Sequence, residues 1–87
     1  MPVSLFATIE NDGVLSRQQY QVEAESGQDA VMKVVQMMAP ILGALKSLRS
    51  VTEHIWELEF EDIQGKVLCM SVVEVDVLDE GTIIERI

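Results

Sequence analysis

Residues 3–24, VSLFATIENDGVLSRQQYQVEA, carry the clearest structural signal in the chain and predict a sheet that begins with a hairpin. Residues 3–10 place an apolar side chain at every odd position, which is the pattern of a half-buried strand. The residues Asn11-Asp12-Gly13 tolerate the positive φ angles of a tight turn. A two-residue turn then places Leu5 opposite Tyr20, so that apolar side chains share one face of both strands.

A long helix is expected after this hairpin. Ser26 can cap its first turn, and Asp29 occupies the capping-box position at the positive end of the helix dipole. Apolar residues continue at helical spacing from Ala30 to Leu48. Pro40 lies inside this segment and should kink the helix or split it in two, because it removes one backbone hydrogen bond.

The apolar residues of this helix occupy most of its circumference, whereas one sheet face covers only about a third of a helix. A second copy of the chain is the simplest cover for the remainder. We therefore expect a homodimer whose contact includes four residues of the segment: Met37, Met38, Ile41 and Leu45.

A second hairpin is expected over residues 52–61 and 66–78. In its first strand the residues His54, Trp56, Leu58 and Phe60 share one face. A four-residue turn pairs Glu61 with Lys66 and Leu58 with Cys69. A turn at 79–81 and a short last strand over 82–87 follow.

The chain is therefore expected to form a single domain over residues 1–87 of the α+β class. Its order is β-β-α-β-β with a short fifth strand, and one long Pro-kinked helix packs on one face of the antiparallel sheet.

The charge balance favours basic partners. Acidic residues outnumber basic ones 15 to 6, for a net charge of −9, which disfavours direct binding to nucleic acid. Cys69 is the only cysteine, so an internal disulfide is excluded and a reducing compartment is the simpler environment. The first residues carry no positive charge, and no apolar run approaches the roughly 20 residues of a membrane helix. We expect a cytoplasmic protein without membrane contact.

The expected register of the second hairpin also defines a candidate partner-binding face. Carboxylates and apolar side chains alternate on it, and exposed apolar patches rimmed by charge usually mark protein contacts. Eight residues form this face: Glu53, Ile55, Glu57, Glu59, Glu61, Leu68, Met70 and Val72.

Catalytic and metal-binding chemistry has little support in the sequence. His54 is the only histidine, and it is expected at the start of a strand in a partly buried position. Cys69 is expected inside the fold as an inert thiol. Strand carboxylates two residues apart are about 6.5–7 Å apart, too far for a compact metal site without a loop that gathers them. We therefore expect no enzyme, no metal and no cofactor.

The favoured hypothesis is a non-enzymatic protein-interaction module that self-associates and presents an acidic surface to a basic partner. One specific version is an acidic inhibitor, of the kind that phages and mobile elements encode against defence proteins, that occupies a nucleic-acid-binding surface. The alternatives are a structural subunit of a larger assembly, and a small-ligand or enzyme domain near His54 and Trp56.

Overall fold

The computed structural model describes residues 2–77 and 83–86. In chain order the elements are β1 (Pro2–Asn11), β2 (Val14–Glu23), α1 (Gly27–Leu42), β3 (Ala44–Thr52), β4 (Ile55–Glu61), β5 (Val67–Val77) and β6 (Ile83–Glu85). The strands form one antiparallel sheet in the order β2-β1-β5-β4-β3, and β6 pairs with the end of β5. The predicted α+β architecture of an antiparallel sheet with one helix is confirmed, with one strand more than expected.

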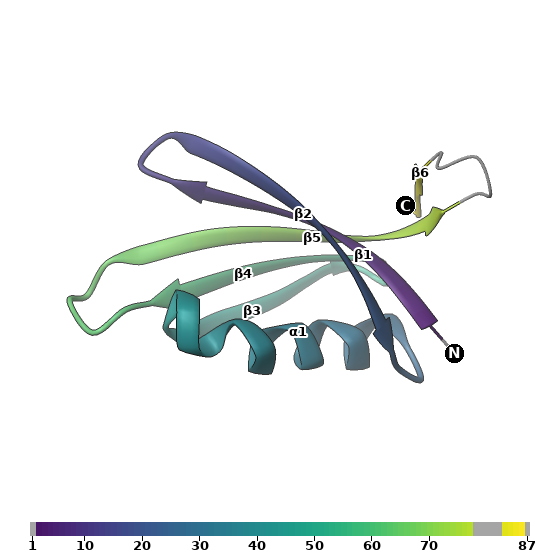
Figure 1. Cartoon of the computed structure of the whole chain (residues 1–87), viewed down its shortest axis with the longest axis horizontal. Coiled ribbons are helices and arrows are strands. Elements are labelled where there is room, and N and C mark those ends of the chain that lie inside the picture. Colours follow the sequence, from purple (N-terminus) through teal and green to yellow (C-terminus); the bar gives the residue numbers. More distant parts are fainter. Residues whose placement is uncertain (1, 78–82, 87) are drawn as a thin grey trace.

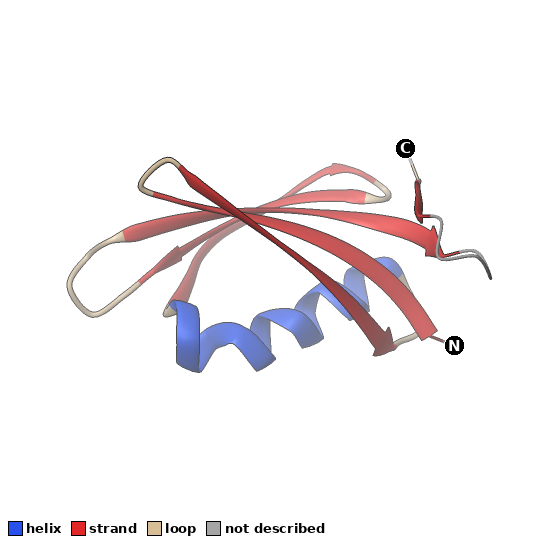
Figure 2. Ribbon diagram, turned by 45° about the horizontal axis from the view of Figure 1, so that its top comes forward, coloured by secondary structure: helices blue, strands red, loops and turns tan. Residues whose placement is uncertain are grey.

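The sheet is twisted and curved, and α1 lies across its concave side (Figure 1). The opposite side, which we call the outer face, is not covered by a helix of the described residues (Figure 2). The core therefore forms a single layer between α1 and the concave side. It contains the buried side chains Leu5, Ala7 and Ile9 of β1, Val31, Val34 and Met38 of α1, Trp56, Leu58 and Phe60 of β4, and Met70 and Val72 of β5. None of the described helical residues forms a helix long and apolar enough to cross a membrane.

The first hairpin has the register that the sequence predicts. Leu5 lies opposite Tyr20, and the pairing of β1 with β2 runs without interruption from Pro2 to Asn11. Asp12 and Gly13 form the turn with φ angles of 53° and 81°. Positive φ at both central residues is the mark of a type I′ turn, whose twist matches that of the strands.

The start of α1 is also confirmed. Ser26 accepts a hydrogen bond from the Asp29 backbone N–H at 3.2 Å, and the Asp29 carboxylate accepts one from the Glu25 backbone N–H at 3.2 Å. The helix continues past Pro40 but ends at Leu42. The helix expected as far as Leu48 is therefore too long.

Residues 44–52 form β3 instead of the second half of that helix. A bulge in β3 explains why a helix was expected there. The pairing of β3 with β4 shifts register between Leu45 and Ser47, so that Leu45 and Leu48 both pack against the core although they are three residues apart. A spacing of three is typical of a helix, but one bulge also produces it in a strand.

The second hairpin differs from the prediction by one residue. Residues 62–66 form a five-residue loop, in which the Asp62 carboxylate accepts hydrogen bonds from the backbone N–H groups of Gln64 and Lys66, both at 2.9 Å. Leu58 therefore pairs with Met70 rather than with Cys69. A one-residue shift moves every side chain of a strand to the opposite face.

This shift corrects four expectations. Cys69, expected inside, is exposed. Met70 and Val72, expected on the outer face, are buried in the core, and Leu68 packs against it. The short last strand is present as β6, whereas the turn expected at 79–81 lies outside the described residues.

Candidate protein-binding face

The register of the five strands β2, β1, β5, β4 and β3 arranges the outer face in rows. In the first row, Cys69 of β5 lies between Glu10 of β1 and Glu59 of β4, its direct cross-strand neighbours. Adjacent strands are about 4.8 Å apart, so the two carboxylates flank Cys69 at roughly 10 Å from each other. The row ends at Leu15 on β2 and Ser47 on β3.

Two further rows complete the face. The second runs from Arg17 of β2 through the small polar side chains of Thr8 and Ser71 to Glu57 and Arg49. The third is apolar and contains Phe6, Val73 and Ile55, all partly exposed. A shallow groove of about 550 Å³ runs along the first two rows and is lined by Thr8, Glu10, Leu15, Ser47, Arg49, Glu57, Leu58, Glu59, Cys69, Met70 and Ser71.

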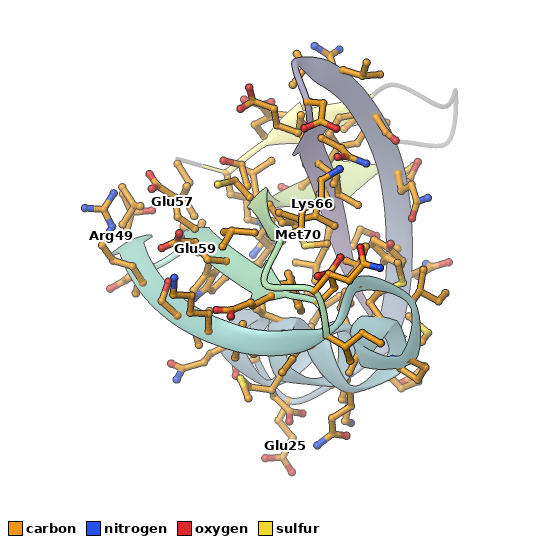
Figure 3. The ribbon with its side chains drawn as sticks, turned by 90° about the vertical axis from the view of Figure 1, so that its left-hand side faces the viewer. Glu25, Arg49, Glu57, Glu59, Lys66 and Met70 are labelled. Atoms are coloured by element: carbon orange, nitrogen blue, oxygen red, sulfur yellow. The ribbon has the colours of Figure 1, made fainter. Side chains whose placement is uncertain are left out.

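Basic side chains of β3 neutralise part of the negative charge carried by the glutamates of β4. The Arg49 Nη2 atom lies 2.8 Å from Glu57 Oε2, and Lys46 Nζ lies 3.7 Å from Glu61 Oε2. Glu59 differs, because it accepts a neutral hydrogen bond from the Ser47 hydroxyl at 2.9 Å. Arg49, Glu57 and Glu59 lie beside β3 and β4, away from α1 (Figure 3).

Two carboxylates of the groove consequently keep an unbalanced charge. Within residues 2–77 and 83–86, neither Glu10 nor Glu59 forms an ion pair with a Lys, Arg or His side chain. These two residues flank Cys69, so the negative charge of the groove is concentrated in the first row.

Four of the eight residues predicted for partner binding are on or beside this face. Ile55, Glu57, Glu59 and Glu61 are on β4, whereas Glu53, in the turn before β4, lies near the start of α1 and lines a different hollow. The other three, on β5, face the core. Their places on the outer face are taken by Cys69, Ser71 and Val73. Sequence reasoning missed these three residues because the predicted register of β5 was wrong by one residue. Glu10 could have been found, because it alternates with the apolar positions of β1.

The predicted dimer contact is divided between surface and core. Met37 is 54% exposed and Ile41 is 75% exposed. Met38 is buried in the core, and Leu45 packs against the core from β3. Only Met37 and Ile41 are therefore available to a second molecule.

His54 belongs to a separate cluster at the other end of the molecule, beside a hollow of about 620 Å³. Its Nδ1 atom lies 3.0 Å from Oε1 of the buried Glu74, and Arg86 Nη1 lies 3.1 Å from Oε2 of the same carboxylate. Arg86 also bonds Asp76 at 2.7 Å, and this hydrogen bond lowers the pKa of Asp76 below its usual value. The pKa of Arg86 is raised in turn.

Close packing against α1 holds Glu74 in place. A methyl group added at Gly27 would lie 2.5 Å from Glu74 Oε1 and 2.7 Å from the Trp56 ring. Both carboxylate oxygens of Glu74 are engaged by His54 and Arg86. Among the described side chains that are not exposed, every buried nitrogen or oxygen atom has a hydrogen-bond partner. The cluster therefore joins β5, β6 and the β3–β4 turn to the start of the helix.

The possible nucleophile and base of the chain are far apart. Glu74, the partner of His54, lies on the concave side, whereas Cys69 lies on the outer face five residues earlier, or about 17 Å along β5. In the described part of the chain, no three His, Cys, Asp or Glu side chains are placed to hold a metal ion.

Comparison with known proteins found no family model, curated protein or solved structure that matches this chain.

Proposed function

We propose that this chain is a non-enzymatic protein-interaction module that self-associates and presents the outer face of its sheet to a basic partner. The observation that carries the proposal is the groove, whose Cys69 row sets Glu10 and Glu59 beside a strip of small side chains. A Lys or Arg side chain of a partner entering between them would gain two charge-assisted hydrogen bonds.

The apolar row beside the groove supports the same proposal. Phe6, Val73 and Ile55 are only partly covered, and they lie one row away from Ser71 and Glu57. Protein interfaces combine an apolar centre with a polar rim. A partner with a basic side chain next to an apolar one fits this arrangement.

The specific inhibitor version concerns the identity of that partner. A protein whose basic surface binds nucleic acid presents regularly spaced Arg and Lys side chains, and the carboxylates of the groove would replace phosphates there. We do not propose a ligand or catalytic role for the His54 hollow, because His54, Glu74 and Arg86 already bond one another.

Capture of the tagged protein from lysate of its own host, after nuclease treatment, tests the proposal when variants are included. We expect one stoichiometric partner on the native chain, lost from the Glu10→Gln/Glu59→Gln variant. Glu25→Gln/Glu53→Gln is the matched control, since it removes the same charge near the start of α1 and should keep the partner. Equal capture by both variants would refute a role for the groove.

A further inference from the structure

The two edges of the sheet are built differently. β3, at one end of the strand order, has two register irregularities and carries Lys46 and Arg49, and both features oppose pairing with another strand. β2, at the other end, keeps an unbroken register over ten residues and has one basic residue, Arg17. β2 is therefore the edge that can accept a further strand.

The turn geometry identifies the backbone groups that β2 leaves open. A type I′ turn at Asp12-Gly13 makes Asn11 and Val14 a hydrogen-bonded pair, so the even residues of β2 bond β1 and the odd residues point outward. The Glu23 carbonyl confirms this direction, because it accepts a hydrogen bond from Lys33 Nζ at 2.7 Å.

Lys33 thereby occupies one end of the edge. Four residues remain with outward backbone groups that no hydrogen bond of the described chain uses: Leu15, Arg17, Gln19 and Gln21. They are arranged symmetrically about Gln18.

A row of α1 side chains lies beside this edge on the concave side. Lys33, Met37 and Ile41 are four residues apart and share one side of the helix. Lys33 reaches the end of β2, and Ile41 lines a hollow of about 550 Å³ together with Val14 and Gln18. The exposed Met37 lies between them, so a strand added to β2 would cover apolar surface as well as backbone.

The distribution of charge along the chain indicates which strand can be added to β2. Residues 13–22 and 30–52 contain no Asp or Glu, and all 15 acidic residues lie elsewhere in the chain. Two molecules of charge −9 can approach most readily where no carboxylates face each other. Residues 14–22 of β2 and the neighbouring row of α1 form such a surface.

We propose that β2 pairs antiparallel with β2 of a second copy of this chain, centred on Gln18. Arg17 then lies opposite Gln19 of the partner subunit, and Val14 lies opposite Val22 of the partner subunit. A two-fold axis perpendicular to the sheet keeps both helices on the same face. Each copy uses its one open edge, so the assembly closes as a dimer and does not grow into a filament. This inference deepens the self-association in the proposed function and does not depend on Glu10, Glu59 or Cys69 of the groove.

Gln19→Pro tests the edge directly. Its N–H points outward, so proline should leave the pairing of β2 with β1 intact while it removes the central hydrogen bonds of the dimer. We expect the native chain to be a dimer by sedimentation and the variant to be a monomer with an unchanged circular dichroism spectrum. Ser50→Pro on the β3 edge is the control and should remain a dimer.

The register has its own test at the same position. Gln19→Glu places a carboxylate opposite the partner's Arg17 and should tighten the dimer by about three- to tenfold, although it adds negative charge. Gln19→Lys should weaken the dimer by a similar factor. In a Cys69→Ser background, Gln18→Cys should form an intermolecular disulfide, because residues facing each other on the axis have Cα atoms about 4.5 Å apart.

These outcomes distinguish pairing through β2 from self-association through another surface. A monomer at all concentrations would overturn both. A dimer that survives Gln19→Pro and gives no Gln18→Cys disulfide, but is lost in Ile41→Asp, would retain self-association and overturn the pairing of β2.

Discussion

At the scale of single residues, Gly27 is a position with little room for a side chain. Its lack of a side chain allows the buried Glu74 carboxylate and the Trp56 ring to approach the first turn of α1. Ser26 precedes it as the helix cap. The cap and the close approach together fix where the helix begins against the sheet.

We expect Gly27→Ala to lower the free energy of unfolding by about 1–3 kcal/mol, because the added methyl group overlaps both neighbours. This outcome is opposite to the usual effect of Gly→Ala in a helix, which is stabilising. Urea unfolding followed by tryptophan fluorescence measures the change, since Trp56 is the only tryptophan. Gln28→Ala, at an exposed neighbouring position, is the control and should change stability little. A stabilised Gly27→Ala chain would contradict the close packing.

At the scale of elements, β6 is a three-residue strand whose one partner among the described strands is the end of β5. Its pairing is supported by Arg86, which bonds Asp76 and Glu74 of β5 and donates its backbone N–H to the Glu74 carbonyl at 2.8 Å. So short a strand depends on these side-chain contacts more than on its ladder.

We expect the protection of the Arg86 amide from hydrogen exchange to depend on pH through Asp76. The folded pKa of Asp76 is lowered by Arg86, so its contribution is present above the usual Asp pKa of about 4 and is lost as pH falls through the lowered value. Asp76→Asn should reduce protection at neutral pH and remove this dependence. Asp12→Asn, whose ion pair with Lys66 lies elsewhere, should behave like the native chain. Identical pH profiles in Asp76→Asn and the native chain would exclude this ion pair as the support of β6.

The elements also show how far the sequence predicts the fold. The Asp12-Gly13 turn and the Ser26 cap are local signals, and the structure confirms both. The β3 strand was missed because a bulge gives Leu45 and Leu48 helical spacing. The residues facing outward on β5 were missed because the loop has five residues rather than four. The Asp62 carboxylate supports this longer loop by accepting hydrogen bonds from two backbone N–H groups. Of the candidate face, the β4 half was therefore predictable and the β5 half was not.

At the scale of the whole molecule, charge is divided between surfaces. Residues 30–52, which include most of α1 and all of β3, carry three basic residues and no acidic one. The remaining residues hold every carboxylate, and the groove contains two that lack a basic partner among the described residues, Glu10 and Glu59. Charge therefore favours the binding of a basic partner to the groove, whereas the net charge of the chain opposes the pairing of two copies through β2.

We expect salt to act on the two surfaces in opposite directions. Raising ionic strength from about 0.05 to about 0.5 M shortens the Debye length from roughly 14 to roughly 4 Å. Binding of a basic partner to the groove should weaken, because its attraction is screened. Pairing of β2 should strengthen or stay constant, because screening reduces the repulsion between two chains of charge −9. Sedimentation of the protein alone and titration with its captured partner, over the same salt series, measure both. If self-association weakened with salt in parallel with partner binding, the two copies would be meeting through attracting charges, and residues 14–22 of β2, which carry no carboxylate, would not be their contact.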